Sequence, residues 1–378
     1  MSSFLFNQSS RGSSSARRIL ILPFSFFMFF SFVLSAKAQD ASSQIKSEIQ
    51  RVQQSLKDKP LPEIPDIPKT ITDALKHASD ALAAGHLYVS LEQLGEAEDL
   101  LQGVRSLQEK KDAIKESVPA FEEEWGKANL QLAALNKSVQ GKDWSHTIAA
   151  IQALSEAAQG RAVPLMEGSR GFATATGPKE GLFYMGEAQG QTAFAVFVSK
   201  LNAPRKTSQI PLRSLLPELE ALQEKTNAAF QPPKSIEMHP RFIQLNSTIK
   251  FARELDSSKA YAGALYQYLE AVRHYGMLDP AVPDAAKQAA LRSAVADELK
   301  KFSASRRDDS IAQIFPEKAD AWLHKANGEP TSPDEWRAIH VVIDRVLPAY
   351  YAALKPAAPM QQRAARTTTL TLVRWPYT

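Results

Sequence analysis

The regular spacing of apolar residues at helical intervals is the feature that most constrains the fold of this chain. Alanine and leucine recur every third or fourth position along most of the sequence after Thr72. This period places apolar side chains on one face of an α-helix. The sequence therefore predicts an all-α protein whose amphipathic helices bury their apolar faces against one another. The clearest stripe consists of Leu87, Leu91, Leu94, Ala97 and Leu101.

Similar stripes predict helices along the rest of the chain, separated by glycine and proline. Residues 194–198 have the composition of a strand, but their helical surroundings favour a helix. Ser332, before Pro333 and with Glu335 downstream, indicates a helix start. We expect antiparallel helical hairpins, stacked as an α-solenoid-like array or an irregular helical bundle. The expected helices cover 72–84, 87–104, 119–139, 144–159, 182–201, 211–230, 241–255, 258–275, 283–303, 317–326 and 333–354.

Three segments depart from the helical pattern. Prolines alternate with other residues over 60–68, which predicts a stiff, extended spacer behind a short N-terminal helix. Residues 160–181 contain several glycines among small polar residues, which predicts a long loop. The alternating threonines near the end predict an extended tail. The expected organisation is a signal peptide at 1–38, an N-terminal helix and proline-rich linker at 39–69, a helical domain at 70–230, a second helical unit at 241–360 and a tail at 361–378.

The first residues have the composition of an export signal. Three arginines precede an apolar run at 19–34, and Ala36-Lys37-Ala38 offers the small residues that a signal peptidase reads. The alternative is an uncleaved membrane anchor, but sixteen helical residues span only about 24 Å of a hydrocarbon core that is ~30 Å thick. We therefore expect cleavage before Gln39, a periplasmic or secreted protein, and no stable membrane span after the leader is removed.

Charge and cysteine content restrict the partners and the chemistry. Residues 1–38 hold four basic residues and no acidic one, so the rest of the chain carries 41 basic and 41 acidic residues. Without a global basic surface, nucleic acid is not an expected partner. The chain has no cysteine, which excludes disulfides, thiolate metal sites and cysteine nucleophiles. Its stability must come from buried apolar area, and the lack of disulfides fits a bacterial periplasm better than an animal extracellular space.

Two windows share a more specific spacing of small and large residues. Small residues let paired helices approach closely, and large ones fill the groove to the next pair. The spacing resembles that of tetratricopeptide repeats, which implies helical hairpins that bind a protein or peptide. Both windows lack the closing proline of that family, and no continuous repeat joins them, so ordinary helical hairpins remain the alternative. The windows are Ala78, Ala81, Gly85, Leu87, Ser90, Leu94 and Ala97, and then Ala252, Leu255, Lys259, Tyr261, Ala264, Tyr268 and Ala271.

No local motif indicates catalysis, a cofactor or a metal. The chain has no H-E-x-x-H, no G-x-S-x-G and no P-loop. Its seven histidines are scattered without metal-ligand spacing, so structural or surface roles are expected for them. The glycines at 186 and 190 lie in a helical pattern and predict close helix packing rather than a dinucleotide site. The charged segment 306–309 predicts a solvated connector, with a clamp for an acidic group as the alternative.

Tyrosines provide the candidate binding residues. Tyr261, Tyr266 and Tyr268 crowd one predicted helix. Tyrosine combines apolar contact area with a polar tip and is favoured at recognition surfaces. Because Tyr261 and Tyr268 lie seven residues apart, they should share a face, with a place in the core as the alternative. Tyr266 lies off that face and is predicted to be an exposed contact.

Two hypotheses about function follow. The first is a non-enzymatic scaffold in the cell envelope, whose hairpins present a groove to a protein or peptide. The alternative is a hydrolase or lyase that acts on an envelope polymer, with a site assembled from distant helices. Glu187, His274 and Asp344 are the candidate acid–base residues of that alternative. A pocket lined by several titratable groups with shifted pKa values would favour the enzyme.

Overall fold

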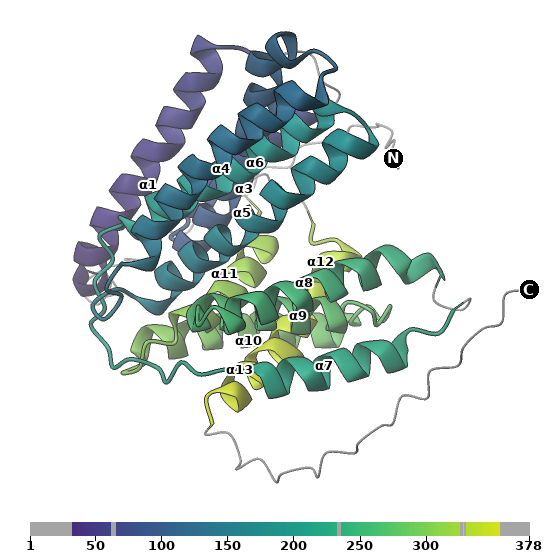
Figure 1. The fold of residues 1–378 in the computed structure, drawn as a ribbon. Coiled ribbons are helices and arrows are strands. Elements are labelled where there is room, and N and C mark those ends of the chain that lie inside the picture. The colour runs from purple at the N-terminus through teal and green to yellow at the C-terminus, as the bar shows by residue number, and fades with distance from the viewer. Residues whose placement is uncertain (1–31, 62–65, 233–235, 326–327, 329, 356–378) are drawn as a thin grey trace, which may run out of the picture.

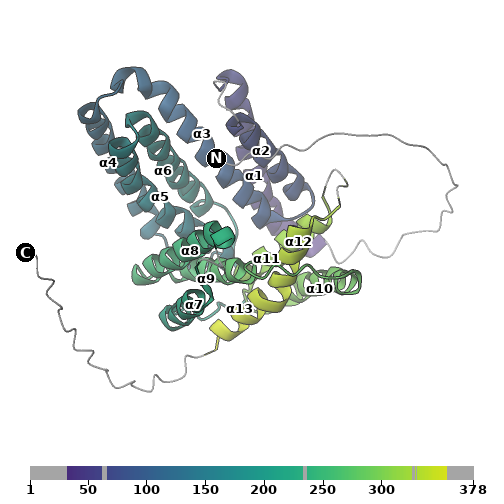
Figure 2. The same ribbon diagram turned by 90° about the vertical axis from the view of Figure 1, so that its right-hand side faces the viewer.

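The computed structural model is an all-α molecule with its helices arranged in two layers. It describes residues 32–61, 66–232, 236–325, 328 and 330–355. The long helices α1–α6 lie side by side in the first layer, and α7–α13 lie across one end of it (Figures 1 and 2). Over the described ranges there is no β-strand, only two isolated β-bridges. The predicted all-α fold class, antiparallel helical hairpins in a solenoid-like array or an irregular bundle, is therefore confirmed.

The helices occur where the apolar stripes predict them, mostly with small shifts of their ends. The strand-like segment 194–198 lies inside a helix, as expected from its surroundings. The first layer consists of α1 (Phe32–Asp58), α2 (Ile67–Ala83), α3 (Leu87–Ile114), α4 (Val118–Gln140), α5 (Ala149–Ala175) and α6 (Pro178–Ser199). The second layer consists of α7 (Leu216–Ala229), η1 (Ile236–Met238), α8 (His239–Ser257), α9 (Tyr261–Gly276), α10 (Ala285–Ala304), α11 (Ser310–Leu323), α12 (Pro333–Val341), η2 (Val342–Val346) and α13 (Leu347–Ala353).

The long loop predicted at residues 160–181 is wrong. Helix α5 continues through Pro164 to its end at Ala175, and only Thr176 and Gly177 separate it from α6. Gly160 is an interhelical contact, because a Cβ there would lie 2.6 Å from the Leu255 side chain of α8. Packing of α5 against α6, α8 and α9 thus outweighs the weak intrinsic helix propensity of its glycines and proline.

Some sequence predictions lie outside the described residues. These are most of the signal peptide (1–31), the centre of the proline-rich linker (62–65), part of the boundary at 231–240 and the C-terminal tail (361–378). The described helix α1 begins at Phe32 and passes the predicted cleavage position after Ala38. Further along, α1 places Ile45, Ile49 and Val52 in the core. No helix of the described ranges is long and apolar enough to cross a membrane.

Both repeat-like windows form antiparallel helix pairs, α2–α3 and α8–α9, joined by the same turn. Gly85 and Lys259 occupy equivalent positions and both have positive φ, 85° and 64°. The backbone hydrogen bonds also match: His86 N–H donates to the Ala81 carbonyl (2.8 Å), and Ala260 N–H donates to the Leu255 carbonyl (2.9 Å). The two hairpins are therefore locally alike at the turn. Membership of the tetratricopeptide-repeat family stays a prediction.

Buried carboxylates cap the N-termini of distant helices, and three of the four contacts join the two layers. The first N–H groups of a helix have no partner within it, and their dipoles favour a negative charge. Each of the four helices concerned lacks a side-chain cap from its own N-cap residue. The acceptor and donor pairs are Glu317 with Tyr88 N–H (3.1 Å), Asp308 with Ala149 N–H (2.7 Å), Asp256 with Leu215 N–H (2.6 Å) and Glu156 with Gly263 N–H (2.8 Å).

The prediction of a solvated connector at 306–309 is wrong for its two acidic residues. Asp308 is 3% exposed, because its carboxylate caps α5. Asp309 is 7% exposed and accepts a hydrogen bond from the hydroxyl of buried Tyr350 at 2.7 Å. Arg307 pairs with Asp309 at 2.8 Å. Asp308 thus fastens the segment to the first layer, whereas the charge of Asp309 is used within the second layer.

Candidate functional site

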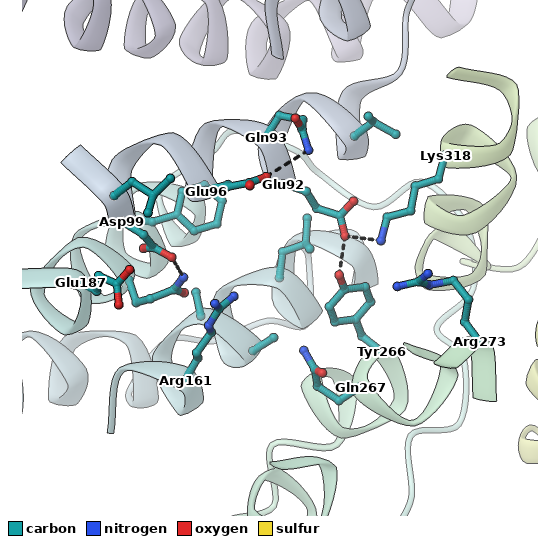
Figure 3. Close-up of a pocket in the computed structure, with 18 of the residues that line it drawn as sticks. Glu92, Gln93, Glu96, Asp99, Arg161, Glu187, Tyr266, Gln267, Arg273 and Lys318 are labelled. Atoms are coloured by element: carbon teal, nitrogen blue, oxygen red, sulfur yellow. Dashed lines mark hydrogen bonds and ion pairs between the residues drawn. The ribbon is translucent and has the colours of Figure 1, made fainter. Parts of the chain in front are cut away.

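A polar pocket of about 630 Å³ lies between the two layers. Figure 3 shows side chains from both layers directed into it. A pocket of this size at a junction between structural units is the usual setting of a ligand site. Its walls come mainly from α3, α5 and α6 of the first layer and from α9 and α11 of the second. The ionisable lining residues are Glu92, Glu96, Asp99, Arg161, Glu187, Tyr266, Arg273 and Lys318, and the amides are Gln93, Gln191, Gln244 and Gln267.

Close contact between α3 and α6 builds one end of the pocket. A Cβ on Gly186 would lie 2.8 Å from the Cα of Gly103, and one on Gly190 would lie 2.9 Å from the Cα of Asp99. Only glycine permits the two backbones to approach this closely. The predicted close helix packing at 186 and 190 is thus confirmed. It brings Glu187 and Gln191, which lie beside these glycines on α6, next to Asp99 on α3.

Three carboxyl groups gather at this end, and we call Glu96, Asp99 and Glu187 the carboxyl cluster. Gln191 donates a hydrogen bond from its side-chain amide to Oδ2 of Asp99. Burial raises the pKa of Asp99 to about 8, against a partial opposing effect of Arg161 and Gln191, and Glu187 and Glu96 raise it further. Burial also raises the pKa of Glu187, and Arg161 lowers it. Asp99 is therefore largely protonated at neutral pH in the ligand-free protein.

The other end of the pocket is a network of paired charges, and we call Glu92, Tyr266, Glu270, Arg273 and Lys318 the ionic cluster. The Lys318 ammonium contacts Glu270 at 2.6 Å and Glu92 at 2.7 Å. Arg273 lies one helical turn from Glu270 on α9 and pairs with it at 2.8 Å. The Tyr266 hydroxyl donates to Glu92 (Figure 3). Each charge in this network therefore has an opposite partner.

Pairing decides the ionisation of this network. Burial acts to raise the pKa of Glu270, but Arg273 and Lys318 outweigh it and hold that pKa below its ordinary value. Burial raises the pKa of Glu92, which Lys318 offsets only in part. Burial and then the Glu92 and Glu270 charges place the pKa of Tyr266 well above its ordinary value. Tyr266 thus stays a hydrogen-bond donor at physiological pH.

The two hairpins contribute equivalent positions to the pocket. Glu92 on α3 and Tyr266 on α9 are 174 residues apart, the same offset that relates the turns of the two hairpins. Gln93 and Gln267 have this relation too, and both line the pocket. The second helix of each hairpin therefore turns corresponding faces toward one cavity. The hydrogen bond between Tyr266 and Glu92 joins those faces directly.

The tyrosine predictions need one correction. Tyr266, predicted to be exposed, is only 8% exposed, because its ring packs near Phe315 and its hydroxyl bonds to Glu92. It nevertheless lines the pocket. Tyr268 is buried in the core, and Tyr261 is half-buried beside a minor cavity near α13. The structure thus separates Tyr261 and Tyr268 from the pocket, and a binding role for the three tyrosines stays a prediction.

The three residues named for an enzymatic alternative do not converge. Glu187 lines the pocket at its carboxyl end. His274 follows Arg273 on α9, and burial, with the Arg273 charge, lowers its pKa to about 4. Asp344 lies on η2, where it pairs with Lys287 at 2.9 Å and His340 at 2.7 Å. Of these three residues, only Glu187 lines the pocket.

The sequence analysis missed most of the pocket residues, although one signal was available. Glu92, Glu96 and Asp99 recur at i, i+4 and i+7 and so mark a single face of α3. Such a stripe ordinarily indicates a solvated face. Arg161 and Lys318 carry no local signal, because their position in the pocket depends on how α5 and α11 pack. In the described ranges, no group of three histidine or acidic side chains is placed to hold a metal ion.

Comparison of the chain with protein-family models, with curated proteins and with solved structures finds no match in any of the three. The protein is therefore described by the physical features of its fold and pocket. It is an all-α, two-layer protein with a polar, charge-lined cavity where its two similar hairpins meet.

Proposed function

We propose that the protein is an exported, non-enzymatic binding protein that holds a short peptide in the pocket between its two layers. The observation that carries this proposal is the composition of the pocket wall. It combines carboxyl groups, basic groups and four glutamine amides around about 630 Å³. A pocket of this volume suits a ligand of a few residues.

The chemistry of a peptide matches that wall. A peptide backbone offers N–H donors and C=O acceptors in alternation, and a glutamine amide can satisfy both. The glutamines come from α3, α6, α8 and α9, so they surround the cavity from both layers. Free peptides also carry one charge of each sign at their ends, and the pocket presents groups of each sign. Phe194 and Trp322 add apolar surface for side chains.

The ionic cluster supports binding rather than turnover. Lys318, Glu270 and Arg273 are already paired at 2.6–2.8 Å, which fixes their positions before a ligand arrives. Fixed groups lower the ordering cost of binding. A reacting acid or base needs its proton free to transfer, whereas these groups hold one another.

Calorimetric titration of the full chain with alanine dipeptide, tripeptide and tetrapeptide tests the proposal. We expect saturable binding, and we expect Gln267→Trp, which fills the pocket, to weaken it by about tenfold or more. Gln54→Trp is the control, since Gln54 lies on α1 outside the pocket and should leave affinity within about twofold. Absence of binding by all three peptides would overturn the proposal.

A hydrolase or lyase acting on an envelope polymer is the second candidate, favoured by one observation. Asp99 has a pKa of about 8 in the same pocket as Glu187, whose pKa is also raised. A carboxyl group that stays protonated at neutral pH can act as a general acid. Purified peptidoglycan should then yield new chain ends with the native protein and none with Asp99→Asn. Equal, background-level release by both proteins would reject catalysis.

Export is the second part of the proposal, and it rests on the leader-like sequence. When the full chain is expressed in a bacterium, the mass of the recovered protein reports whether processing occurs. We expect a mature N-terminus at Gln39 and recovery from the periplasm or medium. Recovery of the unprocessed chain from the cytoplasm would contradict export.

A further inference from the structure

A buried carboxyl oxygen without a partner marks the carboxyl end of the pocket. Asp99 is 5% exposed, and its Oδ2 accepts the hydrogen bond from Gln191. Its Oδ1 is buried and has no hydrogen-bond partner among the described residues. Buried polar atoms of this kind are rare in folded proteins, and each calls for a specific cause. Here the residue lines a cavity, which leaves room for a partner that is not part of the chain.

The surroundings of that oxygen decide which partner fits. Glu96 precedes Asp99 by three residues on α3 and lies on the same wall, and Glu187 reaches it from α6 (Figure 3). Glu98, the neighbour of Asp99 in sequence, is also a buried acid, but it pairs with Arg51 of α1 at 2.8 Å and does not line the pocket. Arg161 of α5 is the cation on this side, but it is exposed and makes no ion pair or hydrogen bond with any described residue. Asp99 and Glu187 thus lie side by side without a direct cation partner, because Arg161 acts on them only through its charge. Glu96, beside them on the wall, accepts a hydrogen bond from Gln93 at 3.4 Å.

We propose that the carboxyl cluster is the subsite for a primary ammonium group of the bound ligand, an inference that rests on the peptide-binding function proposed above. An ammonium group presents three donors on one atom. Oδ1 of Asp99 and the carboxyl oxygens of Glu96 and Glu187 offer acceptors from two helices. A carboxylate ligand has no donor for these oxygens, and a backbone amide N–H donates to one acceptor only.

Proton balance gives the subsite a measurable signature. Before binding, burial keeps the Asp99 carboxyl protonated at neutral pH, because its pKa is about 8. An ammonium group beside Oδ1 favours the ionised carboxylate, so the Asp99 proton leaves to solvent as the charge pair forms. Arg161 acts in the same direction, while Glu187 and Glu96 oppose it. Binding at pH 7 should therefore release protons, and the net release should fall to near zero at about pH 8, where the peptide amino group also begins to lose its own proton.

The experiment compares trialanine with N-acetyl-trialanine on the full chain. Calorimetric titration at pH 7 in phosphate and in imidazole, neither of which contains a primary ammonium group, separates proton release from intrinsic binding heat, since the two buffers take up protons with different enthalpies. We expect N-acetylation to weaken binding by about tenfold or more and to abolish proton release. N-acetyl-Ala-Lys-Ala distinguishes the source of the ammonium, because proton release with this peptide shows that a lysine side chain also enters the subsite.

Variants assign the effect to the cluster. Asp99→Asn keeps an oxygen acceptor for Gln191, so we expect it to fold, to abolish proton release and to bind both trialanine forms with equal affinity. Glu187→Gln is the second variant, should the first fail to fold, and we expect it to weaken trialanine selectively. Asp112→Asn, exposed on the same helix, is the control and should behave as the native protein.

The outcomes separate the two proposals. If neither peptide form binds, the peptide-binding function fails. If both bind equally to the native protein, the pocket binds peptides but the ammonium subsite is wrong. The subsite has an independent readout in n-butylammonium chloride, which we expect to shift the 13C signal of the Asp99 carboxyl carbon, identified by its loss in Asp99→Asn. If high concentrations of n-butylammonium chloride leave this signal where sodium chloride of equal ionic strength leaves it, the proposed subsite is wrong even if peptides bind.

Discussion

The two ends of the pocket contain similar kinds of side chain but satisfy them differently. In the ionic cluster, Lys318 bridges Glu92 and Glu270, and Arg273 completes the pairing. In the carboxyl cluster, Oδ1 of Asp99 has no partner within the described residues. Burial raises the pKa of Asp99 to about 8, whereas paired cations hold that of Glu270 below its ordinary value. One end is satisfied by its own ion pairs, and the other leaves a buried oxygen without a partner among the described residues.

This difference distinguishes charges that stabilise the folded protein from charges that are available to bind a ligand. A buried ion pair carries a large desolvation cost, so removal of one partner is strongly destabilising. A buried acid can avoid that cost by keeping its proton, which also leaves it free to respond to an incoming cation. The comparison therefore predicts that stability is sensitive at the ionic cluster and that binding is sensitive at the carboxyl cluster.

The largest effect is expected at Lys318. Replacing it by methionine keeps much of the side-chain volume but leaves Glu92 and Glu270 without their shared cation. We expect Lys318→Met to lower the free energy of unfolding by about 3–5 kcal/mol, measured by urea denaturation at pH 7. Lys287→Met is the control, because Lys287 pairs with Asp344 at 2.9 Å on the surface and should cost less than about 1 kcal/mol. Equal losses for both variants would remove the distinction between buried and exposed pairs.

A smaller effect is expected where α3 meets α6. A Cβ on Gly186 would collide with the backbone oxygen of Gln102 and lie 2.8 Å from the Cα of Gly103. We expect Gly186→Ala to destabilise by about 1–3 kcal/mol, since the helices must separate. Gly126→Ala is the matched control on α4, where a Cβ meets nothing within 4 Å, and it should stabilise by about 0.5–1 kcal/mol. Thermal unfolding of both variants measures the two changes in stability, which should have opposite signs. A stabilised Gly186→Ala would refute the close contact.

The pH dependence of stability separates the two ends by sign. Asp99 holds its proton in the native state to about pH 8 but has an ordinary pKa of 3.8 when unfolded, so stability is lost as pH rises between these values. In the native protein this loss amounts to at most about 1.4 kcal/mol of unfolding free energy per pH unit. We expect Asp99→Asn to lack it, because asparagine does not ionise. Glu270 acts oppositely: its depressed pKa contributes stability above pH 4.5, which is lost as pH falls below that value.

Urea denaturation of the native protein and Asp99→Asn at pH 5, 6.5 and 8 measures this slope. Asp112→Asn should remain parallel to the native protein, because that residue is exposed. Parallel curves for all three proteins would show that Asp99 ionises normally in the native state and that the two ends do not differ in this respect.

The smallest effect is expected at Glu96. It belongs to the carboxyl cluster but its side chain is exposed, so its charge costs little to hydrate. We expect Glu96→Gln to change the free energy of unfolding by less than about 0.5 kcal/mol. Chemical denaturation of this variant beside Asp99→Asn at pH 8 provides the comparison. A change in Glu96→Gln as large as that in Asp99→Asn would mean that proximity of charges, not burial, governs this end.

Prediction from sequence succeeded where the signal was local and failed where packing intervened. Apolar periodicity located the helices, and the glycines at 186 and 190 indicated a close helix contact, because both signals depend on spacing within one helix. The loop expected at 160–181 failed, since α5 is held helical by its neighbours despite Pro164. Tyr266 was placed on the surface from its position on α9 alone, yet α3 and α11 cover it.

The helix caps show the same division. Ser117, Asp284 and Ser332 cap α4, α10 and α12 through hydrogen bonds to backbone groups three residues along, a relation that sequence alone determines. The caps of α3, α5, α7 and α9 come from carboxylates 41 to 229 residues away, at Glu317, Asp308, Asp256 and Glu156 respectively. No local pattern distinguishes these acids from surface acids.

Local residue patterns are sufficient to predict the α-helical class, the positions of most helices and the breaks within the two similar hairpins. Tertiary structure alone decided which charged residues are buried, which of them pair and which face the pocket. The reason is the separation along the chain of the residues that interact. Helix formation depends on contacts three or four residues apart, whereas burial of an acid and its choice between a proton, a cation and a helix terminus depend on residues brought together only by packing.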